Sequence, residues 1–252
     1  MEPEIVAHPD LRSATADAAE RIAIICERAV AARGACAVAL SGGETPKPLY
    51  ALLASEPYRG RIPWPRLQVF WGDERCVPPD DPRSNYRLAH DLLLSKVAVP
   101  AEHIYRVQGE LADHNAAAAA YGKTVRAVLP ATADGWPRFD LVLLGLGDNA
   151  HTASLFPRSG ALNERRHAAV AEFVQDVGMW RITLTVPVLT HAAETIVLAA
   201  GASKADAVRA SLEGPPVPEV PGAFIRPVDG RVTWLLDAPA ASRLTRRPAA
   251  GA

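Results

Sequence analysis

The chain has 252 residues, of which 49% are hydrophobic and 22% charged, and its formal net charge is −1. This length fits one large α/β domain or two small ones, and the near-neutral charge provides no basic field to attract nucleic acid or an anionic membrane. Three cysteines without a Cys-x-x-Cys pair argue against a disulfide framework and a structural zinc site. The chain shows no signal peptide and no run of roughly 18 apolar residues, so we expect a cytoplasmic protein without nucleic-acid, membrane or metal partners.

Apolar runs typical of buried strands alternate along the chain with amphipathic or alanine-rich helical segments. In chain order, the predicted elements are a helix over residues 13–33, a strand over 35–40, a helix over 46–54, a strand over 67–71, helices over 85–97 and 114–128, strands over 139–144, 169–174, 182–186 and 195–200, a helix over 203–212 and a strand over 232–236. This alternation predicts an α/β fold: a doubly wound, mostly parallel sheet with helices on both faces. We expect one domain over residues 1–252 with a frayed tail at 245–252, the loop at 130–137 being the alternative boundary.

A glycine turn, Ser41-Gly-Gly-Glu-Thr45, follows the first predicted strand and precedes a helix. The amides of Gly42 and Gly43 can approach an anion closely, the helix N-terminus favours negative charge, and the hydroxyls of Ser41 and Thr45 can donate further hydrogen bonds. Thr45 before Pro46 is typical of a helix N-cap. The turn matches neither a P-loop nor a dinucleotide fingerprint, and an ordinary glycine turn with a threonine cap explains it equally well.

A charged cluster follows the second predicted strand, in the order Asp73, Glu74, Arg75. An acid and an arginine at a strand end can orient a polyol and balance an anion. A structural ion pair between Asp73 and Arg75 is the alternative, and for Glu74 the structural interpretation is the stronger one.

A histidine follows the buried run at residues 139–144, after a turn that contains Gly145 and Gly147. Ligands bind outside the carboxyl ends of strands in open α/β sheets. Such a turn would deliver His151 there, and its ordinary pKa suits proton transfer near neutrality. A histidine that acts directly on water is the simplest chemistry, because no Gly-x-Ser-x-Gly nucleophile elbow is present. The alternative is a histidine that caps or packs a helix start.

Five segments in this order resemble the 6-phosphogluconolactonase family: LSGGETPKPLY, VFWGDERCVPPDDPRSNY, LLGLGDNAHTASLFP, RITLTVPVL and AGASKADAVR. The resemblance runs from about Val38 to the final predicted strand. It implies a cofactor-free, Rossmann-like α/β hydrolase, related in fold to glucosamine-6-phosphate deaminases. That family converts the sugar-phosphate lactone 6-phospho-D-glucono-1,5-lactone to 6-phosphogluconate in the oxidative pentose phosphate pathway. We expect a monomer or a weak homodimer.

The resemblance also implies roles for single residues. His151 matches the catalytic histidine, which takes a proton from the attacking water and returns one to the departing ring oxygen. Asp73 would orient His151 or the sugar hydroxyls, and Arg75 would contact the substrate. The 6-phosphate would be held by amides and side chains of the glycine turn and by two later cations: Ser41, Gly42, Gly43, Thr45, Arg181 and Lys204.

The sequence departs from the family pattern beside the histidine and in the glycine turn. Asn149-Ala150 stands where the family usually has Asp-Gly, and Glu44 replaces a small residue. Alanine is strained at this position if the family's glycine has a positive φ. Two alternatives stay open: an amino-sugar-phosphate isomerase or deaminase, whose histidine is typically followed by Ile-Ala-Phe-Asn-Glu rather than Thr152-Ala-Ser-Leu-Phe-Pro, and a non-catalytic sugar-phosphate-binding protein.

Overall fold

A computed structural model describes residues 2–245 and 248–251 and contains a seven-stranded sheet in the order β10-β1-β9-β8-β5-β2-β3. Every neighbouring pair in this sheet is parallel, which confirms the predicted α/β class. In chain order its strands are β1 (Glu4–His8), β2 (Cys36–Leu40), β3 (Leu67–Trp71), β5 (Leu141–Leu144), β8 (Glu194–Ala199), β9 (Arg231–Asp237) and β10 (Ala249–Ala250).

The central strands are apolar because both faces of the sheet are covered. Every residue of β2 and of β5 is buried, as expected for strands inside a parallel sheet. From β2 the chain continues to β3 on one side, whereas β5, β8 and β9 follow one another on the other side. The strand order therefore reverses between β2 and β5, and such a switch point is where ligands bind in open α/β sheets.

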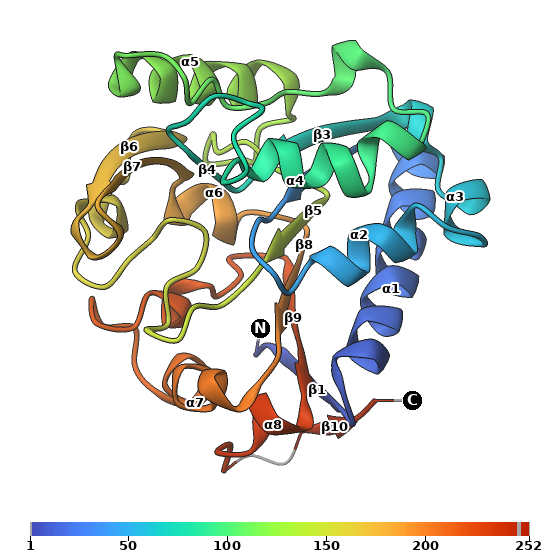
Figure 1. The fold of residues 1–252 in the computed structure, drawn as a ribbon, viewed down its shortest axis with the longest axis vertical. Helices are drawn as coiled ribbons and strands as arrows, with labels where there is room; N and C mark the ends of the chain where they lie inside the picture. Colours follow the sequence, from blue (N-terminus) through green and yellow to red (C-terminus); the bar gives the residue numbers. More distant parts are fainter. Residues whose placement is uncertain (1, 246–247, 252) are drawn as a thin grey trace.

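Helices pack on both faces of the main sheet (Figure 1). One face buries its apolar side chains against α1 (Leu11–Arg33), α2 (Lys47–Leu53), α3 (Tyr58–Arg61) and α4 (Asn85–Leu92). The other face is covered by α5 (His114–Val128), α6 (Val186–Thr190), α7 (Ala205–Glu213) and α8 (Ala238–Ala241). Short 3₁₀ turns complete the chain: η1 (Trp64–Arg66), η2 (Leu94–Lys96), η3 (Ala101–His103), η4 (Gly160–Asn163), η5 (Gln175–Val177), η6 (Ala202–Lys204) and η7 (Pro221–Phe224).

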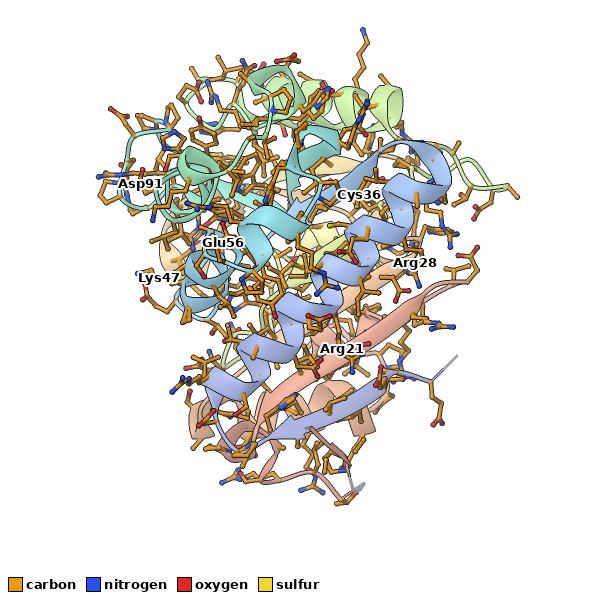
Figure 2. All side chains as sticks on the ribbon, turned by 90° about the vertical axis from the view of Figure 1, so that its right-hand side faces the viewer. Arg21, Arg28, Cys36, Lys47, Glu56 and Asp91 are labelled. Atoms are coloured by element: carbon orange, nitrogen blue, oxygen red, sulfur yellow. The ribbon has the colours of Figure 1, made fainter. Side chains whose placement is uncertain are left out.

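Helix α1 is joined to the main sheet by two ion pairs. Arg21 contacts Glu4 of β1 at 3.0 Å, and Arg28 contacts Glu194 of β8 at 2.7 Å. Figure 2 shows both arginines on α1. Exposed pairs of this kind contribute at most about 1 kcal/mol each, so the buried apolar face of the helix provides most of the stabilisation.

A second, antiparallel sheet was not predicted. It consists of β4 (Asp73–Arg75), β7 (Met179–Leu184) and β6 (Ala169–Val174), in this order. The strand predicted at 182–186 ends at Leu184, because Val186 and the proline after it begin α6. β6 and β7 resemble other strands in the sequence, whereas β4 is a charged triplet that was not predicted as a strand. The pairing of all three outside the main sheet depends on long-range contacts.

Most other predicted elements agree to within two residues at each end, and the larger differences lie at helix ends and in the tail. Thr45 does not cap α2, because Pro46 occupies the cap position and no side chain accepts a hydrogen bond there. The helix predicted at 85–97 ends at Leu92 and is followed by η2, and the one predicted at 203–212 begins as η6. Within the tail expected to fray, Ala249–Ala250 form β10, which pairs with β1, and residues 246, 247 and 252 lie outside the described residues.

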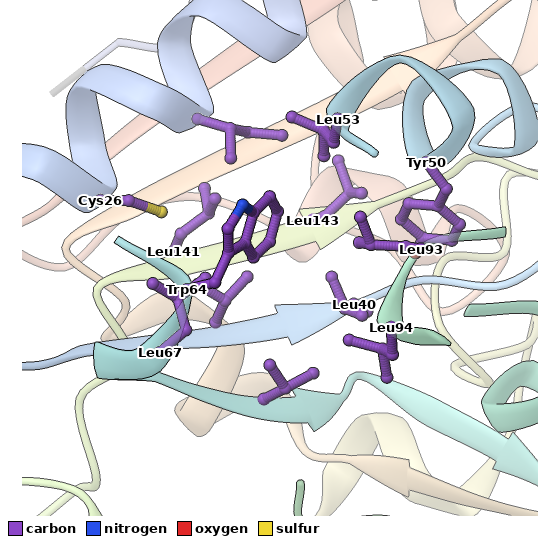
Figure 3. Close-up of a pocket in the computed structure, with 13 residues that line it drawn as sticks. Cys26, Leu40, Tyr50, Leu53, Trp64, Leu67, Leu93, Leu94, Leu141 and Leu143 are labelled. Atoms are coloured by element: carbon purple, nitrogen blue, oxygen red, sulfur yellow. The ribbon is translucent and has the colours of Figure 1, made fainter. Parts of the chain in front are cut away.

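A small cavity of about 20 Å³ lies between α1 and the sheet, with Cys26, Trp64 and Leu141 among its lining residues (Figure 3). It has room for about one water molecule, but its lining is apolar and the Tyr50 hydroxyl beside it is bonded to Ser41. This cavity is therefore a packing defect rather than a ligand site. In the described part of the chain, no helix is long and apolar enough to cross a membrane.

Candidate active site

A cavity of about 520 Å³ opens at the carboxyl ends of β2, β3, β5 and β8. The loops that follow β2 and β5 line it, so the cavity lies at the switch point of the main sheet. The small antiparallel sheet contributes residues from β4 and β7. All nine predicted site residues line this cavity: Ser41, Gly42, Gly43, Thr45, Asp73, Arg75, His151, Arg181 and Lys204.

His151 is held on three sides. Its Nδ1 lies 2.6 Å from the amide oxygen of Asn149, and its ring stacks on Phe156 with centroids 4.2 Å apart. Gly147 lies against the ring, because a Cβ at this glycine would stand 2.0 Å from Nδ1. Nε2 has no hydrogen-bond partner among the described residues and is not fully buried, so this nitrogen is the one available for chemistry.

The turn before the histidine has left-handed backbone at a non-glycine residue. Ala150 has φ +63° and is buried, and its amide donates to the carbonyl of Gly147 at 3.0 Å. The strain expected if alanine took a positive φ at this position is therefore present. Left-handed backbone costs an L-residue roughly 1–2 kcal/mol, which the surrounding packing must offset.

The electrostatic surroundings favour the neutral form of His151. Burial lowers the pKa of its imidazole, the nearby carboxylate of Asp73 raises this pKa, and the cations Lys204 and Arg181 lower it. The net effect is a pKa below the ordinary value of the side chain. A neutral imidazole with a free Nε2 can accept a proton near neutral pH.

Buried contacts hold the glycine turn in place. The Tyr50 hydroxyl bonds both the amide and the carbonyl of Ser41. Gly42 has no space for a side chain, because a Cβ there would stand 1.8 Å from the Asn85 amide oxygen. Gly43 has φ +92°, and in the described part of the chain the amides of Gly42 and Gly43 have no acceptor. Two free amides at the edge of a cavity can bind an anion.

Glu44 does not disturb that anion site. It also lines the cavity, but its side chain is 86% exposed and pairs with Lys47 at 2.7 Å, so solvent and the Lys47 ammonium offset the charge of its carboxylate.

Asp73 is buried, and its carboxylate accepts hydrogen bonds from two side chains. Ser154 Oγ donates to one oxygen at 2.6 Å, and Asn85 Nδ2 lies 3.3 Å from the other. His151 bonds to Asn149 instead, and no hydrogen bond joins it to Asp73 among the described residues. Asp73 therefore acts on His151 through its charge, and Asn149 sets the orientation of the ring.

The neighbouring Glu74 serves the fold, as its structural interpretation predicts. It accepts hydrogen bonds from the amides of Asn85 and Tyr86 at the start of α4, and burial raises the pKa of its carboxyl.

Two arginines meet on the small antiparallel sheet, with Arg75 of β4 directly opposite Arg181 of β7. The Nε atoms of both guanidiniums are buried without a hydrogen-bond partner. Burial and the neighbouring Arg75 lower the pKa of Arg181. Like charges directly opposite one another on two strands are destabilising, and an anion in the cavity could relieve their repulsion.

A third cation enters the cavity from the loop after β8. Lys204 is mostly buried and forms an ion pair with Asp148, whose side chain is 69% exposed. An anion that binds Lys204 must therefore compete with this carboxylate.

Sequence reasoning missed three residues that position the predicted ones, Asn85, Ser154 and Phe156, and it named Gly147 and Asn149 without their contacts to the ring of His151. All of them lie inside the segments that carry the resemblance. Asn149 is close enough in the chain for its amide to be suspected as a partner of the histidine, whereas the contacts of Asn85 and Ser154 with Asp73 are long-range. No cluster of three or more metal-binding side chains occurs within residues 2–245 and 248–251.

The chain is similar to proteins of known activity. Residues 9–234 match the model of a family described as glucosamine-6-phosphate isomerases/6-phosphogluconolactonase. A 6-phosphogluconolactonase from a Nostoc species is 38% identical, covering 97% of this chain and 100% of the relative. Another, from Streptomyces coelicolor, is 36% identical over 97% of this chain and 95% of its own length.

Solved structures of this family are also similar to the chain. The Trypanosoma brucei 6-phosphogluconolactonase superposes with a TM-score of 0.84 at 33% identity, covering 97% of this chain and 99% of that one. A monomeric glucosamine-6-phosphate deaminase shares the fold, with a TM-score of 0.80 at 21% identity over 96% of this chain and 100% of its own.

Proposed function

Since the chain belongs to the family of glucosamine-6-phosphate isomerases and 6-phosphogluconolactonases, we propose that it hydrolyses 6-phospho-D-glucono-1,5-lactone to 6-phosphogluconate. The observation that carries this proposal is the position of His151. Its ring is fixed in a 520 Å³ cavity with Nε2 unbonded, beside an array of cations and free amides. The proposed reaction is a step of the oxidative pentose phosphate pathway in the cytoplasm.

In the proposed mechanism, Nε2 of His151 takes a proton from a water molecule as the water oxygen attacks the lactone carbonyl carbon. The resulting tetrahedral intermediate collapses, and the bond between this carbon and the ring oxygen breaks. Nε2 returns its proton to the departing oxygen, which becomes a hydroxyl, and the carbonyl carbon ends as a carboxyl group. The negative charge of Asp73 stabilises the imidazolium that exists between the two transfers.

In this proposal, the cations of the cavity bind the phosphate of the substrate. Arg181 and Lys204, with the free amides of Gly42 and Gly43, would hold the 6-phosphate, and Arg75 would contact the substrate. Binding a remote phosphate holds the lactone carbonyl next to the base, which converts binding energy into rate. The cation pair across β4 and β7 supports this assignment, because its charge repulsion is relieved by an anion.

The experiment that tests the proposal is proton release from enzymatically generated 6-phosphogluconolactone, with and without the purified full chain. A chelator is present, since the mechanism uses side chains and water alone. We expect release well above the spontaneous rate, and much slower release from unphosphorylated gluconolactone. No acceleration by the protein would overturn the proposal. Ammonia release from glucosamine-6-phosphate, in place of lactone turnover, would assign the chain to the other branch of the family.

A further inference from the structure

Two hydrogen bonds meet at one atom beside the catalytic ring. The amide oxygen of Asn149 lies 3.1 Å from the backbone nitrogen of His151 and 2.6 Å from its Nδ1. A backbone N–H can only donate, so the atom of Asn149 that faces it is the carbonyl oxygen rather than the NH₂ group. The same oxygen then faces Nδ1, and an oxygen acceptor requires the proton to be on this ring nitrogen.

We propose that Asn149 is a positioning residue that holds His151 in the neutral tautomer with its proton on Nδ1, which leaves Nε2 as the base. The catalytic consequence rests on the proposed function, whereas the tautomer itself does not. The family's usual aspartate at this position would make the same hydrogen bond with a full negative charge. Asn149 thus supplies an oxygen acceptor without that charge.

The surroundings of the ring prevent it from escaping this contact. Phe156 stacks on one face with an interplanar angle of 11°, and Gly147 leaves no gap beside Nδ1 and Cε1. Turning the ring over would place a carbon atom against the Asn149 oxygen and lose the hydrogen bond. Asn149 therefore fixes both the orientation of the ring and the position of its proton.

The absence of a carboxylate charge at position 149 affects the pKa of His151, because the other charges around the ring are evenly divided in sign. The groups that act on it are two carboxylates, Asp73 and Asp148, and two cations, Lys204 and Arg181. An aspartate at position 149 would add a third carboxylate in direct contact with the ring, and an opposite charge at this distance favours the imidazolium. With asparagine, the imidazole stays neutral, and active as a base, further into the acid range.

The test is the ¹⁵N spectrum of His151 as a function of pH in the full-length chain, assigned by comparison with His151→Gln. We expect a protonated Nδ1 and an unprotonated Nε2 near neutral pH. In Asn149→Asp, the titration midpoint of His151 should rise by about one pH unit or more, and the acid limb of kcat/KM should move with it. Asn115→Asp, on the exposed surface of α5, is the charge-matched control and should move neither.

Asn149→Ala tests whether the hydrogen bond to the ring, rather than the folding of the chain, depends on Asn149. It should give a mixture of tautomers and a kcat about tenfold lower or more, which Asn149→Asp restores above its shifted midpoint. The proposal is overturned if Nε2 carries the proton in the unmodified chain, or if Asn149→Asp leaves the titration of His151 unchanged. Because these spectra need no substrate, the tautomer is decided even for a chain that fails to hydrolyse the lactone.

Discussion

The contact between Gly147 and the ring of His151 provides a strong test of the active-site geometry. In Gly147→Ala, the new Cβ would stand 2.0 Å from Nδ1 and 2.1 Å from Cε1, distances that packed atoms do not tolerate. The ring is bonded to Asn149 and stacked on Phe156, so it can move away only by giving up one of these contacts. The substitution should therefore displace the catalytic base while leaving the rest of the cavity intact.

The expected loss follows from the size of this displacement. The ring must retreat by about 1 Å or more, and an error of this size in a reacting group costs about 10²-fold in rate. Overpacking costs roughly 1–3 kcal/mol, and the low end applies because the ring borders an open cavity, into which it can shift at the expense of its contact with Asn149 or Phe156. At about 1 kcal/mol and 2–4 °C per kcal/mol, Tm should fall by only about 2–4 °C. We expect kcat for lactone hydrolysis to fall about 100-fold in a protein that is still folded.

Gly145→Ala is the matched control for this variant. It lies two residues earlier on the same turn, and a Cβ there meets no atom within 4 Å. It should retain most of the parental kcat, measured by proton release, and melt close to the parent in thermal unfolding. Parental kcat in Gly147→Ala, or equal losses in the two variants, would refute the inferred contact.

Three further predictions concern the groups around the histidine. Arg181→Met should raise KM about tenfold or more, because a charged hydrogen bond to the phosphate would be lost, and an unchanged KM would contradict the phosphate assignment. Its Tm should stay equal or rise, because Arg75 loses its like-charged neighbour. Asp148→Asn should lower the inhibition constant of inorganic phosphate about two- to fivefold by freeing Lys204, and weaker inhibition would argue against competition. Ala150→Gly should shift Tm by less than about 3 °C. The substitution relieves about 1 kcal/mol of backbone strain, but it also loses the buried methyl group and gives the unfolded chain more freedom, and these effects offset one another. A larger shift in thermal unfolding would contradict this balance.

The parts of the fold that could be predicted are those that depend on local pattern. β3, α5 and β6 have the predicted bounds, and the glycine turn after β5 brings His151 to the sheet edge as expected. A run of buried apolar residues and an alanine-rich amphipathic stretch specify their conformation within one window of sequence. The parallel sheet then follows, because the segments alternate.

What could not be predicted depends on which segments meet. The pairing of β4 with β7 joins residues more than a hundred positions apart, and it alone sets Arg75 opposite Arg181. Thr45 matches the pattern of a helix N-cap, yet α2 begins at Lys47, and the turn before it is held by the hydrogen bond between the Tyr50 hydroxyl and the Ser41 carbonyl. In the sequence, Asn149 is only a departure from the family pattern. The structure shows that its side-chain oxygen contacts both the backbone amide and the ring of His151.

The central claim is that His151 is the base in lactone hydrolysis. It is tested most directly by kcat for 6-phosphogluconolactone in His151→Ala, measured at low pH, where spontaneous ring opening is slow. The exposed His90→Ala serves as the control. We expect kcat to fall by about 10²–10⁴-fold in His151→Ala and to stay at the parental value in His90→Ala. A His151→Ala variant with near-parental kcat would contradict the account.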